Sequence, residues 1–160
     1  MEIVELDATS IASVRRLNLA ALPIPVQDHI YREALTPPIL SWVALRDGKV
    51  LGAALVHDDD GGQAGGLCLR TIAVDIRARG QGIGRLLLEK VVEHASSMMP
   101  KKKLYLHVQV DNDDAIRLYQ RLGFSVEQRV ANYYRRVACV DCFVMALVFP
   151  VLRTPTTPPS

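Results

Sequence analysis

The chain has 160 residues, of which 49% are hydrophobic and 22% are charged, and its formal net charge is +2. This length and apolar content suit one globular domain with its own core, and they are too small for two ordinary domains. The nearly balanced charge excludes the broad basic field that nucleic-acid binding needs, and the cluster Lys101, Lys102, Lys103 is more typical of a solvated turn.

Membrane, disulfide and metal classes are also disfavoured. No apolar run approaches the roughly 18 residues that cross a bilayer, and the acidic start Met1-Glu2 differs from a signal peptide. The three cysteines are too few for a disulfide framework, and Cys139-x-x-Cys142 lacks the second ligand pair of a zinc site. We expect a soluble, monomeric protein of the cytoplasm, with the nucleus as an alternative, without a metal, a membrane or a nucleic-acid partner.

The periodicity of apolar residues predicts helices and strands in alternation. The predicted strands cover residues 2–6, 41–46, 49–56, 67–74, 104–110, 124–130 and 141–149. The predicted helices end at about residues 21, 35, 97 and 121, and the second of them begins at about residue 26. Asp47-Gly48 predicts a tight hairpin turn, and Gly123 suits the left-handed position after the last helix.

This order of elements predicts an α/β (α+β) domain over residues 1–149, with a mixed, mostly antiparallel sheet. Residues 58–66 are rich in aspartate and glycine, so we expect a flexible hairpin loop there. Residues 150–160 form a Pro/Thr-rich tail that we expect to be disordered.

The stretch RARGQGIGRLLLEKVVEHA, residues 77–95, places three glycines at alternate positions before an amphipathic helix. A dinucleotide fingerprint is excluded because Arg85 or Leu87 stands where its last glycine should be, and no Gly-Lys-Ser/Thr follows for a Walker A loop. Glycines at a helix N-terminus expose backbone N–H groups at the positive end of the helix dipole, where a pyrophosphate can bind. From the glycines alone, anion binding and a plain tight turn are equal alternatives.

Arg79 completes the more specific pattern Arg-x-x-Gly-x-Gly, which resembles the acetyl-CoA signature of the GCN5-related N-acetyltransferases. A second set of residues lies downstream: Leu-Tyr-Leu-His-Val-Gln-Val over 104–110, Asn112, Ala115-Ile116, Tyr119, Gly123-Phe124 and Asn132-Tyr133-Tyr134. Together with Arg16-Leu17-Asn18 and Leu22-Pro23-Ile24, this set resembles the San-type N-terminal acetyltransferases, the catalytic subunits of NatE. The resemblance spans about residues 2–147, whereas the bacterial ribosomal-protein acetyltransferases share only the acetyl-CoA signature. It implies the GNAT fold, a sheet of about seven strands flanked by four helices.

The resemblance also implies a binding site for acetyl-CoA as the cosubstrate. The pyrophosphate would lie on Arg79, Gly80, Gln81, Gly82, Ile83, Gly84 and Arg85, and the pantetheine arm would pair with the backbone of Ile72, Ala73 and Val74. Asn112, Ala115 and Tyr119 would line the cofactor, and Tyr119 would protonate the leaving thiolate, whose pKa is near 8.5. Without the resemblance, Asn112 would be an ordinary helix cap and Tyr119 an ordinary amphipathic-helix tyrosine.

His107 matches the histidine that the family uses, through an ordered water, as the base for the incoming amine. Taken alone, a strand histidine is more often structural. A base is needed because only a neutral amine attacks a thioester. An α-amine has a pKa near 8 and a lysine near 10.4, so deprotonating a lysine at neutral pH costs about 3 kcal/mol more. Peptide N-termini are therefore the easier substrates.

The peptide side is where the chain departs from the San-type pattern. Leu22, Pro23 and Ile24 would wall the pocket for the first side chain, and Tyr133 and Tyr134 would cover the peptide, although plain hairpin packing also explains a Tyr-Tyr pair. Cys68 replaces a tyrosine that the family counts as catalytic, Arg70 replaces a methionine, and Leu22 and Val26 replace an aromatic pair. We expect a wider pocket in which Arg70 favours an acidic substrate residue.

Three hypotheses follow. The first is an N-terminal α-amine acetyltransferase that uses His107 and a water and acts on nascent or mature protein N-termini. The second, motivated by Cys68, is a weakly active or non-catalytic acetyl-CoA-binding subunit of a ribosome-associated acetyltransferase complex with other subunits. The third, motivated by the non-aromatic pocket, is acetylation of a small-molecule amine or a lysine.

Overall fold

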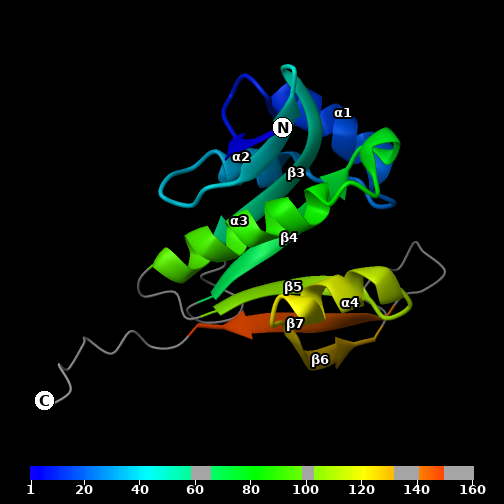
Figure 1. Cartoon of the computed structure of the whole chain (residues 1–160). Helices are drawn as coiled ribbons and strands as arrows, with labels where there is room; N and C mark the ends of the chain where they lie inside the picture. The colour runs from blue at the N-terminus through cyan, green and yellow to red at the C-terminus, as the bar shows by residue number, and fades with distance from the viewer. Residues whose placement is uncertain (59–65, 99–102, 132–140, 150–160) are drawn as a thin grey trace, which may run out of the picture.

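The computed structural model describes residues 1–58, 66–98, 103–131 and 141–149, and within them the chain forms one seven-stranded sheet with four α-helices (Figure 1). The strands are β1 (Glu2–Glu5), β2 (Trp42–Arg46), β3 (Lys49–Asp58), β4 (Gly66–Val74), β5 (Lys103–Gln109), β6 (Ser125–Val130) and β7 (Cys142–Val148). The helices are α1 (Ile11–Ala21), α2 (Asp28–Ala34), α3 (Ile83–Ser97) and α4 (Asp113–Arg121), and a 3-10 turn covers Ile76–Ala78. The predicted fold class is confirmed.

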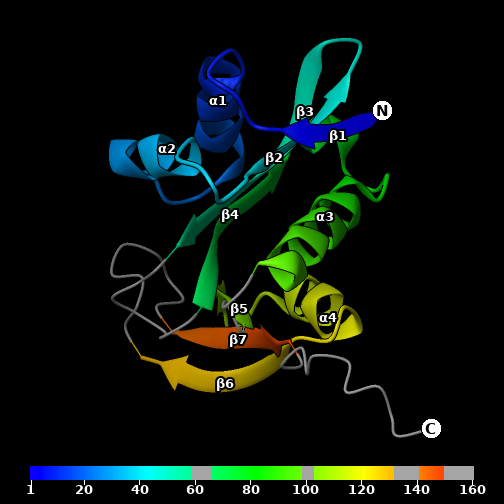
Figure 2. The same ribbon diagram turned by 90° about the vertical axis from the view of Figure 1, so that its left-hand side faces the viewer.

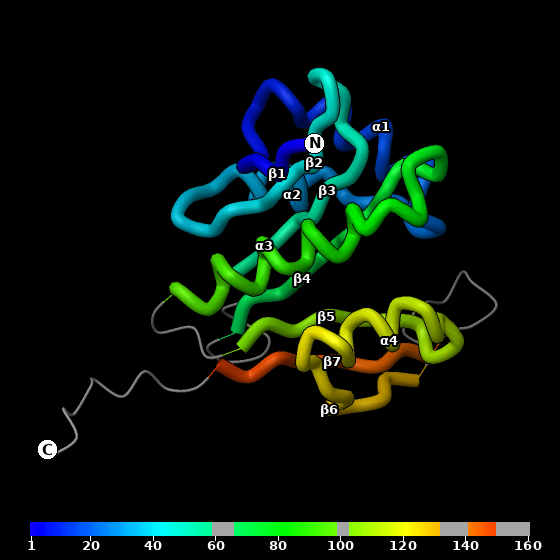
Figure 3. The backbone as a smooth tube through the Cα atoms, viewed as in Figure 1, coloured from blue at the N-terminus to red at the C-terminus, as the bar shows by residue number. Residues whose placement is uncertain are grey.

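The sheet has the order β1-β2-β3-β4-β5-β7-β6 and is antiparallel except between β4 and β5. These two parallel strands pair over three positions only, Gly66 with Lys103, Leu67 with Leu104 and Cys68 with Tyr105. Beyond Cys68 they separate, so that the end of β4 and the end of β5 point away from each other (Figures 1 and 3). The sheet is thereby split by a wedge-shaped opening at its centre.

Helices cover both faces of the sheet, with α1 and α2 on one side and α3 and α4 on the other (Figure 2). The strand β3 serves both layers, because its side chains alternate: Ala53 and Leu55 face α1 and α2, whereas Ala54 and Val56 face α3. On the α3 side the predicted amphipathic helix is confirmed, and its buried residues are Ile83, Leu87, Leu88, Val91 and Ala95. Leu86, which the spacing also placed on the apolar face, is exposed. None of the described helices has the length and apolar character of a membrane span.

Most element boundaries agree with the sequence prediction to within one or two residues. Asp47 and Gly48 both have positive φ, 51° and 75°, as the predicted hairpin turn requires, and Gly123 after α4 has φ 100°. The second helix is shorter than predicted, because Gln27 is extended with ψ 149° and residue 26 belongs to the preceding loop. The loop predicted over residues 58–66 is shorter, because Asp58 ends β3 and Gly66 begins β4. Residues 59–65 between them and the predicted tail lie outside the described residues.

Candidate active site

A cavity of about 510 Å³ lies where β4 and β5 separate. Its walls come from the loop between α1 and α2, the outer parts of β4 and β5, and the beginning and middle of α4. It brings together most of the residues predicted on the peptide and catalytic side, namely Leu22, Pro23, Ile24, Val26, Cys68, Arg70, His107 and Tyr119, and it also includes Asn112 from the predicted cofactor side. Tyr133 and Tyr134 lie outside the described residues, so their prediction is untested.

Contacts between α1 and α2 hold in place the loop over residues 22–27, which forms one wall of the cavity. The buried Asn18 donates from Nδ2 to the Tyr31 hydroxyl at 3.2 Å, and the Arg15 guanidinium lies 4.3 Å from the centre of the Tyr31 ring. Arg15 also contacts the Asp28 carboxylate at 2.6 Å, and this hydrogen bond lowers the pKa of Asp28 below its ordinary value. Both ends of the loop over residues 22–27 are therefore fixed by the two helices.

On β4 the two departures from the family pattern have opposite surroundings. Cys68 is only 1% exposed and packs with Tyr105, Val144 and Ala146, so its thiol sits in an apolar cluster and presents little surface to the cavity. Burial of this kind makes the Cys68 thiol inert rather than reactive. Arg70, in contrast, is exposed, because β4 carries a bulge at this position.

His107 lies on β5, on the same side of the strand as Tyr105 and Gln109, as the alternation predicts. Its ring is partly buried and packs edge-on against the ring of Tyr105, with 6.1 Å between the centroids. Tyr105 is itself only 3% exposed and is held by the sheet. The histidine therefore faces the cavity from a rigid strand with an aromatic neighbour that restricts its rotation.

The beginning and middle of α4 form the other side of the cavity. Asn112 caps this helix, since its Oδ1 accepts a hydrogen bond from the Ala115 N–H at 3.2 Å, and its NH₂ group is left as a donor. Tyr119 is 7% exposed and packs against Phe124 with 5.8 Å between the ring centroids. Burial raises the pKa of Tyr119 to about 12. A phenol with this pKa is protonated at neutral pH and can donate to a thiolate in the cavity.

The glycine loop stands at the far end of the opening, at the start of α3. Gly80 and Gly82 both have φ 79°, and a Cβ added at either would meet nothing within 4 Å, so the backbone conformation is what demands glycine and the space beside the loop is open. Gly84 has no positive φ, and its added Cβ would make an ordinary 3.7 Å contact with Val74. The first N–H groups of α3 have no partner within the helix, so this open loop fits an anion such as a pyrophosphate.

A comparison with known families identifies the family of the chain. The family model described as the acetyltransferase (GNAT) family matches residues 11–124. The chain belongs to the GNAT acetyltransferase family. It is thus an N-acetyltransferase, and the loop over residues 79–85 and the opening beside it lie inside the segment that the family model matches.

Three relatives of this GNAT acetyltransferase are named as N-acetyltransferases. N-alpha-acetyltransferase 50 of Danio rerio is 28% identical over 160 residues, covering 100% of this chain and 94% of the relative. The probable N-acetyltransferase san of Drosophila melanogaster is 26% identical and covers 91% of this chain and 79% of the relative. The L-amino acid N-acetyltransferase AaaT of Escherichia coli is 30% identical and covers 82% of each chain.

A solved relative agrees with the structure over nearly all of its length. It is Arabidopsis thaliana Naa50 in complex with the bisubstrate analogue CoA-Ac-MVNAL, with a TM-score of 0.82 and 26% identity, covering 92% of this chain and 98% of that one. The similarity to the San-type acetyltransferases is thereby supported by sequence and by fold.

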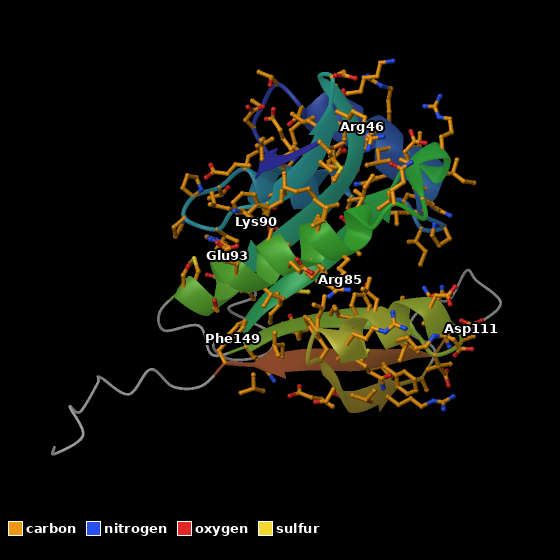
Figure 4. The ribbon with its side chains drawn as sticks, viewed as in Figure 1. Arg46, Arg85, Lys90, Glu93, Asp111 and Phe149 are labelled. Atoms are coloured by element: carbon orange, nitrogen blue, oxygen red, sulfur yellow. The ribbon has the colours of Figure 1, made fainter. Side chains whose placement is uncertain are left out.

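The remaining residues predicted at the GNAT cofactor site differ in how they can take part. Ile83 and Ala73 are buried, 2% and 5% exposed, so only their backbone groups can face a ligand. Ile72 and Val74 also pack against the core on the α3 side, and Ala115 is half-buried on α4. On the surface, Gln81 accepts a hydrogen bond from Arg46 at 3.0 Å, and Arg85 pairs with Glu89 at 2.9 Å. Figure 4 labels Arg85 on α3 and Asp111 in the turn between β5 and α4.

Arg79 lies between the cofactor loop and a second hollow. Its Nε donates to the backbone oxygen of Val74 at 3.4 Å. The second hollow, of about 550 Å³, lies between α1, the β2–β3 turn and residues 75–79, and it shares no lining residue with the cavity at the opening. Arg79 therefore caps the last backbone oxygen of β4, in addition to any contact with a phosphate.

Two residues that the sequence analysis did not select contribute to the GNAT site. Thr71 lines the cavity, and its Oγ1 is buried without a hydrogen-bond partner among the described residues. Gly52 on β3 lies directly beneath the start of α3: an added Cβ would stand 3.0 Å from the Ala73 oxygen and 3.0 Å from Leu87 Cδ1. A glycine inside a strand is a signal for such a close approach, whereas no sequence signal marks the orphaned hydroxyl. The described residues contain no group of three His, Cys, Asp or Glu arranged to hold a metal ion.

We expect the substitution Gly82→Ala to weaken acetyl-CoA binding by roughly tenfold. A Cβ at φ 79° costs about 1–2 kcal/mol in the left-handed conformation, and the loop will relax away from the arrangement that presents its N–H groups. Calorimetric titration with CoA measures the change, and Gly48→Ala serves as the comparison, because its φ of 75° brings the same strain in the turn between β2 and β3, outside the glycine loop. Equal affinities for wild type and Gly82→Ala would show that the loop does not hold the ligand.

Proposed function

We propose that the protein transfers the acetyl group of acetyl-CoA to the α-amine of a peptide N-terminus. The observation that carries this proposal is the opening between β4 and β5, which has His107, Asn112 and Tyr119 around its cavity and the glycine loop at its far end. The Arabidopsis Naa50 structure holds a conjugate of CoA with a peptide, and the Danio rerio relative is named as an α-amine acetyltransferase. Both support a peptide as the acetyl acceptor.

Different residues of the site bind the cosubstrate, deprotonate the amine and stabilise the leaving group. The glycine loop and the first N–H groups of α3 bind the pyrophosphate, and the unpaired edge of β4 beyond Cys68 offers backbone groups to the pantetheine arm. Acetyl-CoA supplies an activated thioester carbonyl. His107 removes a proton from the amine through a water as the N–C bond forms and the C–S bond breaks. Tyr119 donates a hydrogen bond to the departing sulfur.

Cys68 is not required in this scheme, because it is buried in an apolar cluster. The side chain of cysteine is too short to replace the hydroxyl of the family tyrosine at this position. We therefore propose that His107 is the one general base of this site and that the protein is catalytic without the tyrosine. A ribosome-associated complex is the setting we propose for nascent N-termini as substrates.

The test offers acetyl-CoA with peptides that vary in their first two residues, beside an N-terminally blocked lysine peptide and a polyamine. We expect mass spectrometry to find acetyl groups on free α-amines and at least tenfold slower transfer to lysine, because an α-amine is more readily deprotonated at neutral pH. Faster acetylation of the blocked lysine peptide would contradict the proposal. Tight CoA binding without turnover on any amine would instead favour a non-catalytic subunit.

A further inference from the structure

Arg70 places an isolated positive charge in the substrate cavity. Its side chain is exposed and lines the cavity, and in the described part of the chain it forms no hydrogen bond and no ion pair. The described residues that line this cavity include no aspartate and no glutamate. Surface arginines are usually solvated or paired on a convex face, whereas this one stands in a recess without a balancing charge.

The backbone of β4 explains why Arg70 is there. In the pairing with β3, Val56 lies opposite Leu69 and Leu55 lies opposite Thr71, so Arg70 is the extra residue of a β-bulge. A bulge redirects the side chain of its extra residue, and such irregularities are frequent beside active sites. Because of the bulge, the Arg70 side chain does not follow the alternation of side chains between the two faces of the sheet.

Thr71 adds a second polar group with no internal partner. It follows Arg70 directly, it lines the same cavity, and its buried Oγ1 has no hydrogen-bond partner among the described residues. Buried polar atoms in folded proteins are nearly always hydrogen-bonded, so this hydroxyl is a donor beside the cavity that has no acceptor among the described residues. A hydroxyl that can donate and a guanidinium that only donates share one complementary group, an oxygen acceptor with negative charge.

The charge of Arg70 also decides which amines are disfavoured. A fixed cation raises the free energy of placing a second cation in the same cavity. Polyamines and peptides with basic N-terminal residues are therefore poor acetyl acceptors. A carboxylate on the acceptor balances the cation and accepts the two parallel hydrogen bonds that a guanidinium fork offers. The like-charge effect also lowers the pKa of the incoming amine and favours its reactive neutral form.

We propose that Arg70, assisted by Thr71, binds a carboxylate of the acetyl acceptor. This inference rests on the proposed function only in requiring a primary amine as the acceptor. The carboxylate has two chemical sources: the side chain of an acidic residue at the start of a peptide, or the α-carboxylate of a free amino acid. Both place the negative charge within a few bonds of the reacting nitrogen.

Two pairs of acceptors separate the sources. In the first pair, peptides that begin with Asp or carry Asp at the second position are compared with the same peptides containing Asn. In the second pair, free methionine is compared with methioninamide. We expect a preference in kcat/KM of roughly 10- to 100-fold for the carboxylate in one of the two pairs, because a charge-assisted hydrogen bond is worth about that much. The preference should shrink as salt is added.

Variants at Arg70 test whether this residue recognises the carboxylate of the acceptor. Arg70→Gln should abolish the preference, so that the carboxylate and the neutral acceptor of a pair have equal kcat/KM, and Arg70→Lys should restore part of it. Arg121→Gln, at an exposed arginine of α4 outside the cavity, is the matched control and should keep the preference. Thermal melts confirm that each variant is folded.

Two results would overturn the inference. One is equal kcat/KM for the carboxylate and the amide in both acceptor pairs, and the other is a preference that survives in Arg70→Gln. Either of these leaves the proposed acetyl transfer intact, because neutral acceptors are still acetylated. A failure of the proposed function looks different, since then no amine in either pair would be acetylated at all.

Discussion

The substitution His107→Ala is expected to lower kcat for peptide acetylation by about 10²- to 10⁴-fold, the range that a positioned general base contributes. The affinity for CoA should be nearly unchanged, because the glycine loop and α3 form a separate part of the opening. Steady-state kinetics with one good peptide measure the first quantity, and calorimetry measures the second.

The pH dependence sharpens this test. An α-amine has a pKa near 8, so above that pH the substrate arrives already deprotonated and needs no base. We therefore expect the defect of His107→Ala to narrow as the pH rises from 7 to 9. His29→Ala, at a half-buried histidine of α2 that does not line the cavity, is the control and should follow wild type. A His107→Ala enzyme with wild-type kcat at pH 7 would exclude His107 as the base.

The substitution Gly52→Val should be the most damaging change outside the cavity. Even the first carbon of a side chain there would stand 3.0 Å from the Ala73 oxygen and 3.0 Å from Leu87 Cδ1, and one of these neighbours is backbone that cannot move aside freely. Overpacking of this kind costs about 1–3 kcal/mol, and it will push the first turn of α3 away from β4. We expect a melting temperature lower by several degrees and weaker CoA binding.

Gly84→Ala is the matched stability control for Gly52→Val. Its added Cβ would make only an ordinary 3.7 Å contact with Val74, and alanine is preferred over glycine inside a helix. Its melting temperature should equal or exceed that of wild type. If Gly52→Val melts at the wild-type temperature, the close approach of β3 and α3 does not constrain the fold.

Much of the fold could be predicted because its signals are local. The alternation in β5 and the amphipathic spacing in α3 depend only on neighbouring residues, and Asp47-Gly48 carries its turn geometry in its own backbone preferences. The start of α2 was wrong by two residues, because the apolar residue 26 fits a helical pattern although it packs as part of the loop. Boundaries depend on tertiary contacts that no local pattern contains.

The site could be predicted only in part, and for a physical reason. Residues such as His107 and Tyr119 were selected through family resemblance, and the structure places both at one cavity. The bulge at Arg70 and the orphaned hydroxyl of Thr71 depend on how β4 pairs with β3, which is a property of the assembled sheet. Burial of Cys68 likewise follows from its neighbours on β5 and β7 and not from its own segment.

The three-position pairing between β4 and β5 has a consequence for stability as well as for chemistry. The strands pair over so short a seam that a ligand spanning the gap adds contacts between the two halves of the sheet that their backbone pairing does not supply. By mass action, a ligand at a hundredfold excess over its Kd adds about 2.7 kcal/mol to the folded state. The acetyl donor would then stabilise the folded protein in addition to serving as its substrate.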